Sequence, residues 1–154
     1  MAAQATLNGL DGFTLPCKDV PSQGKQANLS GKAAENTIYC IMKERGYTVQ
    51  RQYAIGQSIY GHNVKVDFYI TGIARFPAGL IIESRWQEVT GSADEKFPYM
   101  VQNIQAVYPH PTIIVYGGGG SKLGAIHWLK LQVGGNLYAA FSFEEFMTWA
   151  IRNL

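Results

Sequence analysis

The chain has 154 residues, 47% of them apolar, which is enough for one hydrophobic core and too few for two ordinary domains. Its 13 basic and 11 acidic side chains leave a formal net charge of +2, so overall charge does not by itself mark a nucleic-acid-binding protein. The two cysteines show no zinc-type spacing and no apolar run reaches membrane-span length, so we expect no disulfide framework, zinc site or membrane partner, and a bacterial or phage-encoded protein of the cytoplasm.

The first predicted helix follows an irregular N-terminal arm. Residues 1–30 mix Gly, Gln, Asn, Ser and Pro around few apolar positions, which predicts an arm ahead of a domain at 31–154. Ser30 is positioned to cap a helix that runs to about Arg45 and stops at Gly46. Glu35 lies on the flank of the apolar stripe of this helix.

Three β-strands are predicted next, over residues 47–55, 63–70 and 80–86, with turn-rich segments between them. Links this short favour antiparallel neighbours. Apolar residues recur at helical spacing from 97 to 107 and predict a second helix, and the β-rich segment 112–116 predicts a fourth strand.

The sequence of the C-terminal third predicts further elements after the fourth strand. Residues 121–131 are compatible with a helix or a partly extended segment, and 136–141 with a short strand. Ser142 and Glu145 form a capping-box pattern at the start of a last helix. The element order α-β-β-β-α-β, followed by a strand and a helix, predicts an α/β fold with a mixed central sheet flanked by helices.

Two acids within apolar strands are the main chemical feature. Along 63–70, apolar residues alternate with Lys65, Asp67 and Tyr69, so one face enters the core and the other presents Asp67. Along 80–86, Glu83 and Arg85 share one face by the same two-residue period. Asp67 and Glu83 are therefore expected to face each other across neighbouring strands.

Two carboxylates converging at the end of a sheet suit Mg²⁺, which keeps several waters and takes one or two carboxylates plus substrate phosphate. The bound ion lowers the pKa of an attacking water and balances charge on the scissile phosphate. A basic group two residues after the second acid, on the same face, can orient that water or neutralise the oxyanion. Arg85 holds this position.

The segments VDFYI, IIESRWQ and GSADEKFPY together resemble the PD-(D/E)XK nuclease superfamily, whose motif is an Asp followed by Glu-x-Lys on the next strand. The resemblance covers roughly residues 31–116 and implies a restriction-endonuclease-like αβββαβ core. It also implies that Asp67 and Glu83 are metal ligands, and that Glu35 matches the acid that many members carry on the first core helix.

Arg85 departs from this pattern, because the family usually has a lysine there, and arginine is a poor proton donor or acceptor. In some members the lysine has moved to the following helix, and Lys96 is the candidate for that role here. Gln87 is a candidate contact to the metal's water shell or to a phosphate. Arg51, Lys65, Arg75 and Lys122 are candidate DNA contacts, since they are spread over loops and strand ends.

We therefore expect a Mg²⁺-dependent DNA endonuclease, with Mn²⁺ able to replace Mg²⁺, that works as a homodimer or higher homo-oligomer. Resolution of Holliday junctions, restriction and intron- or phage-borne cleavage all fit. The alternative is a catalytically weakened nuclease fold that binds DNA or assembles with a partner, and a remoter one is a binding module whose strand acids are structural. On such plainer interpretations, Glu83 and Arg85 form a strand-surface ion pair, and Lys96 is a helix-surface lysine.

Overall fold

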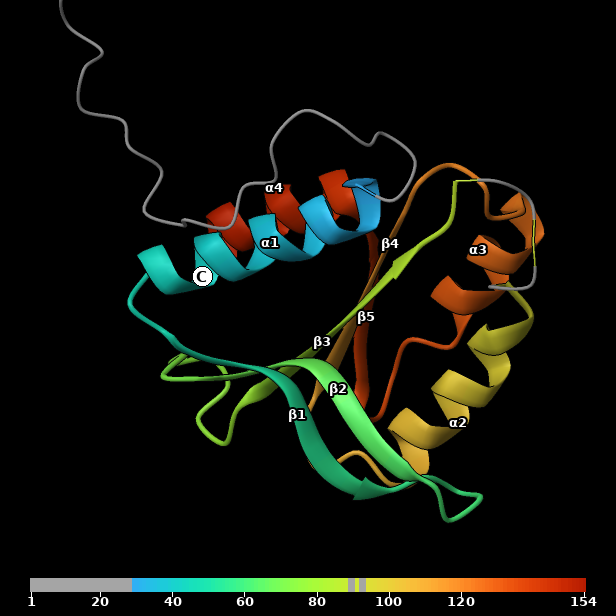
Figure 1. Cartoon of the computed structure of the whole chain (residues 1–154), viewed down its shortest axis with the longest axis horizontal. Coiled ribbons are helices and arrows are strands. Elements are labelled where there is room, and N and C mark those ends of the chain that lie inside the picture. The colour runs from blue at the N-terminus through green and yellow to red at the C-terminus, as the bar shows by residue number, and fades with distance from the viewer. Residues whose placement is uncertain (1–28, 89–90, 92–93) are drawn as a thin grey trace, which may run out of the picture.

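A mixed β-sheet runs through the centre of the protein (Figure 1). The computed structural model describes residues 29–88, 91 and 94–154, and within them the sheet has five strands in the order β1-β2-β3-β4-β5. The strands are β1 (Thr48–Gln57), β2 (Asn63–Thr71), β3 (Leu80–Trp86), β4 (Thr112–Gly117) and β5 (Leu137–Ser142). Of the predicted arm, residues 1–28 lie outside the described residues.

The direction of the strands changes at β3. β1, β2 and β3 are antiparallel neighbours, whereas β3, β4 and β5 are parallel neighbours. The first three strands are joined by short turns, and the two parallel steps each need a crossover that contains a helix. The predicted antiparallel pairing of the first three strands is confirmed.

Helices cover both faces of the sheet (Figure 1). The α-helices of the described residues are α1 (Leu29–Glu44), α2 (Phe97–Ala106), α3 (Leu123–Leu131) and α4 (Phe143–Asn153), and a short 3₁₀ helix, η1 (Asp94–Lys96), leads into α2. One core cluster packs α1 and α4 against the sheet, and a second packs α2 and α3 against its other face. The predicted α/β class with a mixed, helix-flanked sheet is confirmed.

The first helix begins earlier than its sequence predicts. Ser30 is the second residue of α1, so its predicted role as the cap is wrong. Gly31 in this first turn packs so closely against Trp86 that a Cβ there would crowd the indole, and this tertiary contact helps to fix where the helix starts. Gly46 ends the helix with φ of 83°, as predicted. Cys40 on α1 is disulfide-bonded, a cross-link that the spacing of the two cysteines does not indicate.

The C-terminal extension packs α3, β5 and α4 onto the sheet. The ambiguous segment 121–131 is helical from Leu123 onward. The predicted capping box is present, because Glu145 N donates to Ser142 Oγ at 3.1 Å and Ser142 N donates to Glu145 Oε2 at 2.8 Å. Within the described part of the chain, no helix combines the length and the apolar character that crossing a bilayer requires.

Candidate active site

The candidate site lies where β2 and β3 part from each other. Their pairing runs from Ile70 opposite Leu80 to Phe68 opposite Ile82 and ends there. Asp67 and Glu83 are the next residues on the two strands, so both acids lie at the fork where the strands separate. Because side chains alternate along a strand, both point to the face opposite Phe68 and Ile82.

A cleft of about 950 Å³ opens beside this fork. Its walls come from α1, the β1–β2 turn, the start of β2, the end of β3, η1, α2 and the segment after α2. The Lys, Arg and Glu residues that line it are Lys32, Glu35, Lys65, Glu83, Arg85 and Lys96. Among these lining residues four are basic and two are acidic, so the cleft favours anions although the whole chain is nearly neutral.

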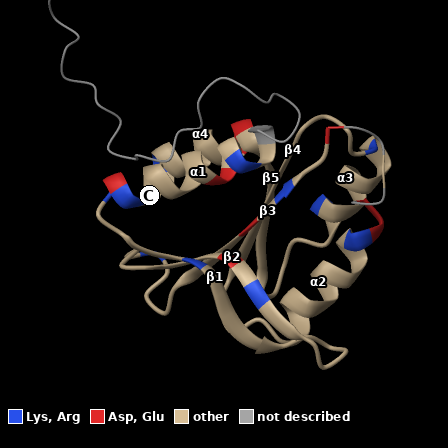
Figure 2. Cartoon of the chain, viewed as in Figure 1, with Lys and Arg blue, Asp and Glu red and all other residues tan. Residues whose placement is uncertain are grey.

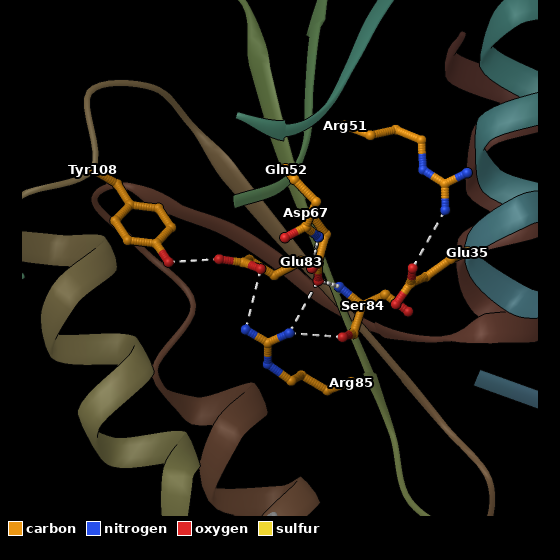
Figure 3. A network of polar contacts seen from close by, with 8 residues as sticks. All are labelled: Glu35, Arg51, Gln52, Asp67, Glu83, Ser84, Arg85 and Tyr108. Atoms are coloured by element: carbon orange, nitrogen blue, oxygen red, sulfur yellow. Dashed lines mark hydrogen bonds and ion pairs between the residues drawn. The ribbon is translucent and has the colours of Figure 1, made fainter. Parts of the chain in front are cut away.

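Arg85 joins the two strand acids (Figure 3). Its Nη1 donates to Asp67 Oδ2 at 3.0 Å and to the backbone oxygen of Ser84 at 2.8 Å, and its Nη2 donates to Glu83 Oε2 at 3.1 Å. Three oxygens from neighbouring strands therefore converge on one guanidinium. Burial by itself would lower the pKa of Arg85, but the negative charges of Glu83 and Asp67 have the larger combined effect. The pKa of Arg85 is therefore raised, and the guanidinium stays charged.

Both carboxylates are held by further hydrogen bonds. Asp67 Oδ2 accepts the backbone N–H of Ser84 at 2.8 Å, and Oδ1 accepts Gln52 Nε2 at 3.2 Å. The Asp67 side chain is 15% exposed and that of Glu83 is 1% exposed. Glu83 is thus an acid placed in the interior, where an unpaired charge would be costly.

Tyr108, from the segment after α2, completes the surroundings of Glu83. Its hydroxyl donates to Glu83 Oε1 at 2.5 Å, while Oε2 of the same carboxylate faces Arg85. Burial raises the pKa of Glu83 to about 7, with Arg85 opposing the shift and Asp67 adding to it. Burial and the Glu83 charge also raise the pKa of Tyr108, so its hydroxyl keeps the proton that it donates.

Glu35 lies on α1 at the edge of the cleft and forms an ion pair with Arg51 (Figure 3). It does not take part in the network in which Arg85 joins the two strand acids. Arg51 Nη2 is 3.6 Å from Glu35 Oε2, and Nη1 donates to Asn36 Oδ1 at 3.2 Å. Burial, followed by the charge of Asp67, raises the pKa of Glu35, and Arg51 opposes this. Arg51 also lies over the Phe68 ring, so its side chain is directed to α1 and not into the cleft.

The remaining predicted site residues divide between the cleft and other surfaces. Lys65 and Lys96 line the cleft with exposed side chains. Gln87 donates to the backbone oxygens of Gly91 and Gly120 and is not brought into the Arg85 network. The other two predicted DNA contacts also lie outside the cleft lining: Arg75 donates to Asn153 and Tyr138, and Lys122 precedes α3.

Sequence reasoning missed Tyr108 and the Ser84 backbone oxygen. Tyr108 follows a run of helical spacing and precedes a proline, a pattern that marks a helix end and says nothing about Glu83. The role of Ser84 comes from its main chain, so the residue type carries no signal. Lys32, one of the basic residues spread along the sequence, lines the cleft one turn before Glu35 on α1.

A family model for the PD-(D/E)XK nuclease superfamily domain matches residues 26–154. The chain belongs to this superfamily. No match was found among curated proteins or among solved structures. The five-stranded sheet and its helices are consistent with the restriction-endonuclease-like fold of PD-(D/E)XK proteins, so the resemblance seen in the sequence is confirmed.

PD-(D/E)XK nucleases generally use divalent metal ions, and the oxygens around Arg85 fit such an ion. Asp67 Oδ2, Glu83 Oε2 and the Ser84 backbone oxygen are hard donors that surround one cationic group. The described residues contain no cluster of three or more His, Cys, Asp or Glu side chains placed for a metal. Two carboxylates and one carbonyl are nevertheless sufficient for Mg²⁺, which takes most of its other ligands from water.

Proposed function

We propose that this protein is a metal-dependent DNA endonuclease that hydrolyses backbone phosphodiesters at the fork between β2 and β3. The observation that carries the proposal is the convergence of Asp67, Glu83 and the Ser84 backbone oxygen on one cationic group beside an open cleft. Membership of a nuclease superfamily supports hydrolysis as the reaction. Mg²⁺ is the proposed ion, and Mn²⁺ is expected to replace it.

In this proposal each residue has a separate task. Asp67, Glu83 and the Ser84 oxygen hold the cation, which would lower the pKa of a water molecule and balance charge on the scissile phosphate. Tyr108 and the Ser84 N–H fix the two carboxylates in place. Arg85 and Lys96 neutralise the phosphate, since both line the same cleft.

The basic lining of the cleft supports a nucleic-acid substrate. Among the described residues, Lys and Arg lie on several helices and strands rather than on a single element (Figure 2). Lys32, Lys65 and Lys96 nevertheless reach the cleft from three different elements. Phosphates that enter the cleft would therefore meet positive charge from several sides.

The test is a cleavage assay on linear, circular and branched DNA, with RNA in parallel, in Mg²⁺, Mn²⁺ or EDTA. We expect products in Mg²⁺ and Mn²⁺, none in EDTA, and none from Asp67→Asn under any condition. Cleavage of RNA but not of DNA would show that the substrate is RNA. Products that persist in EDTA, or with Asp67→Asn, would contradict the proposed site.

A second candidate function follows from Arg85. An arginine at the lysine position can neutralise a phosphate but is poorly suited to move a proton, which favours a nuclease fold that binds DNA with weakened cleavage. DNA binding in a gel-shift assay, without products at any metal concentration, would identify this function. Absence of DNA binding at every salt concentration tested would favour a binding module with no nucleic-acid partner.

We also propose that the protein acts as a symmetric dimer or higher oligomer, because a small nuclease chain with a single active site usually cuts both strands of a duplex by pairing subunits. Light scattering with size-exclusion chromatography, with and without DNA, measures the oligomeric state. A monomer that nicks a single strand would replace this proposal.

A further inference from the structure

The guanidinium of Arg85 occupies the oxygens that the proposed cation needs. Nη1 contacts Asp67 Oδ2 and the Ser84 oxygen at 3.0 and 2.8 Å, and Nη2 contacts Glu83 Oε2 at 3.1 Å. We infer that Arg85 and a divalent metal ion compete for these three oxygens, so that metal binding releases Arg85 into the cleft. The inference rests on the metal site of the proposed function. It adds that a side chain of the same protein competes with the ion for that site.

The two cations cannot share the site. A guanidinium within hydrogen-bond distance of three oxygens fills the space where an ion would contact the same atoms (Figure 3). Two like charges a few ångströms apart also repel each other, the more so beside a carboxylate as buried as that of Glu83. Metal binding must therefore break the hydrogen bonds of Arg85, and part of the metal's binding free energy is lost in doing so.

The carboxylates are fixed, whereas Arg85 has room to move. Glu83 is 1% exposed and is held by the Tyr108 hydroxyl, and Asp67 is held by the Ser84 N–H. The Arg85 side chain is 35% exposed and lines the cleft. Arginine carries its charge on a long, flexible stem, so Arg85 is the partner that leaves when a metal arrives.

Release of Arg85 would couple the metal to the substrate. While the guanidinium is bound to the two acids, its charge is balanced by theirs. Once displaced, the guanidinium is a free cation in a cleft that also presents Lys65 and Lys96, where a phosphate can bind it bidentately. A phosphate in the cleft would in turn stabilise the released form of Arg85, so metal and phosphate should each strengthen binding of the other.

The test measures Mn²⁺ binding by calorimetry, without nucleic acid, to the wild type, Arg85→Gln and the matched control Arg45→Gln. Arg45 is an exposed arginine ten residues beyond Glu35 along the α1 direction, roughly 15 Å away. We expect Arg85→Gln to bind Mn²⁺ at least about tenfold more tightly than the wild type, and Arg45→Gln to bind like the wild type.

The outcomes separate the competition from the metal site itself. Equal or weaker Mn²⁺ affinity in Arg85→Gln, with measurable binding in both proteins, would overturn the competition and leave the metal site standing. No Mn²⁺ binding to either protein would remove the metal site of the proposed function, and the competition with it.

A second measurement uses the wild-type protein, in case Arg85→Gln does not fold. Guanidinium NMR signals of Arg85, assigned by their loss in Arg85→Lys, are followed as Mg²⁺ is added. We expect the Arg85 N–H protons to exchange with water faster as Mg²⁺ saturates the site, because three protecting oxygens are lost. Unchanged exchange at Mg²⁺ saturation would overturn the inference.

Discussion

The Tyr108 hydroxyl donates a 2.5 Å hydrogen bond to Glu83 Oε1, leaving Oε2 directed at Arg85. Tyr108 thus selects which oxygen of the carboxylate is offered to a cation. Residues that orient a metal ligand in this way typically change metal affinity or activity about 10- to 100-fold when they are altered.

We therefore expect Tyr108→Phe to lower both the Mn²⁺ affinity and the single-turnover cleavage rate by at least about tenfold, with little change in DNA affinity. Calorimetry and rapid-quench kinetics measure the two effects. Tyr60→Phe, at a tyrosine 71% exposed, is the control for loss of a hydroxyl. An unchanged Mn²⁺ affinity in Tyr108→Phe would show that its hydrogen bond is only structural.

Asp67→Asn and Glu83→Gln should each reduce cleavage to background, because they remove charge from the proposed metal ligands while keeping side-chain size. DNA affinity measured in Ca²⁺ and the far-UV circular dichroism spectrum should stay close to the wild type. Glu44→Gln, at the exposed end of α1, controls for the change in net charge. Wild-type cutting by either strand variant would remove these residues from the site.

Arg85→Ala should lose far more of the single-turnover rate at saturating Mg²⁺ than Arg85→Lys, since lysine retains a cation in the cleft. A difference of at least about tenfold between the two variants is expected for a charge that stabilises the reacting phosphate. Equal rates in the wild type and both variants would exclude Arg85 as a contact to the reacting phosphate.

Lys96 precedes α2 and lines the cleft. If it contributes to the chemistry, Lys96→Ala should reduce the saturated single-turnover rate much more than the DNA affinity, and Lys96→Arg should restore only part of it. Lys43→Ala is a matched control, since Lys43 is an exposed lysine near the end of α1 and does not line the cleft. If Lys96→Ala weakens only binding and lowers the salt dependence by about one phosphate contact, Lys96 is a backbone contact.

Glu145 provides a stability prediction away from the cleft. Its hydrogen bonds with Lys130 and with the Ser142 N–H lower its pKa, so its stabilising contribution is present above the ordinary carboxyl pKa and is lost as pH falls through the lowered value. Glu145→Gln should cost about 0.5 kcal/mol near pH 7 and progressively less towards about pH 3. Thermal unfolding at several pH values measures this, and a constant difference would contradict it.

The strands and their acids could be predicted because alternation places Asp67 and Glu83 on one face of neighbouring strands. The contact of Arg51 with Glu35, in place of the predicted DNA contact, could not be foreseen from the charge of Arg51. Its register opposite Phe68 turns its side chain to the core face, where it meets α1 and Glu35. Tyr108 could not be found either, because its contact with Glu83 depends on how the segment after α2 returns to the sheet.

At two places the element bounds depend on tertiary packing more than on local sequence, and only the prediction for Ser30 is wrong. Ser30 has the side chain of a cap, yet α1 starts before it, where the close packing of Gly31 on Trp86 fixes the first turn. In α3 the terminal residues Leu123 and Leu131 are exposed and Leu129 is buried, so the apolar pattern is too weak to separate a helix from an extended segment. Tertiary packing overrides local pattern in both places.

The separation of 25 residues between Glu83 and Tyr108 has a consequence during protein synthesis. Asp67 and Glu83 leave the ribosome well before Tyr108, and β4 can pair with β3 only after the whole crossover through α2 has formed. Until then the buried acid has neither its hydroxyl partner nor its parallel neighbour. A nascent chain therefore carries the two acids without an organised cleft, at least until β4 has been synthesised.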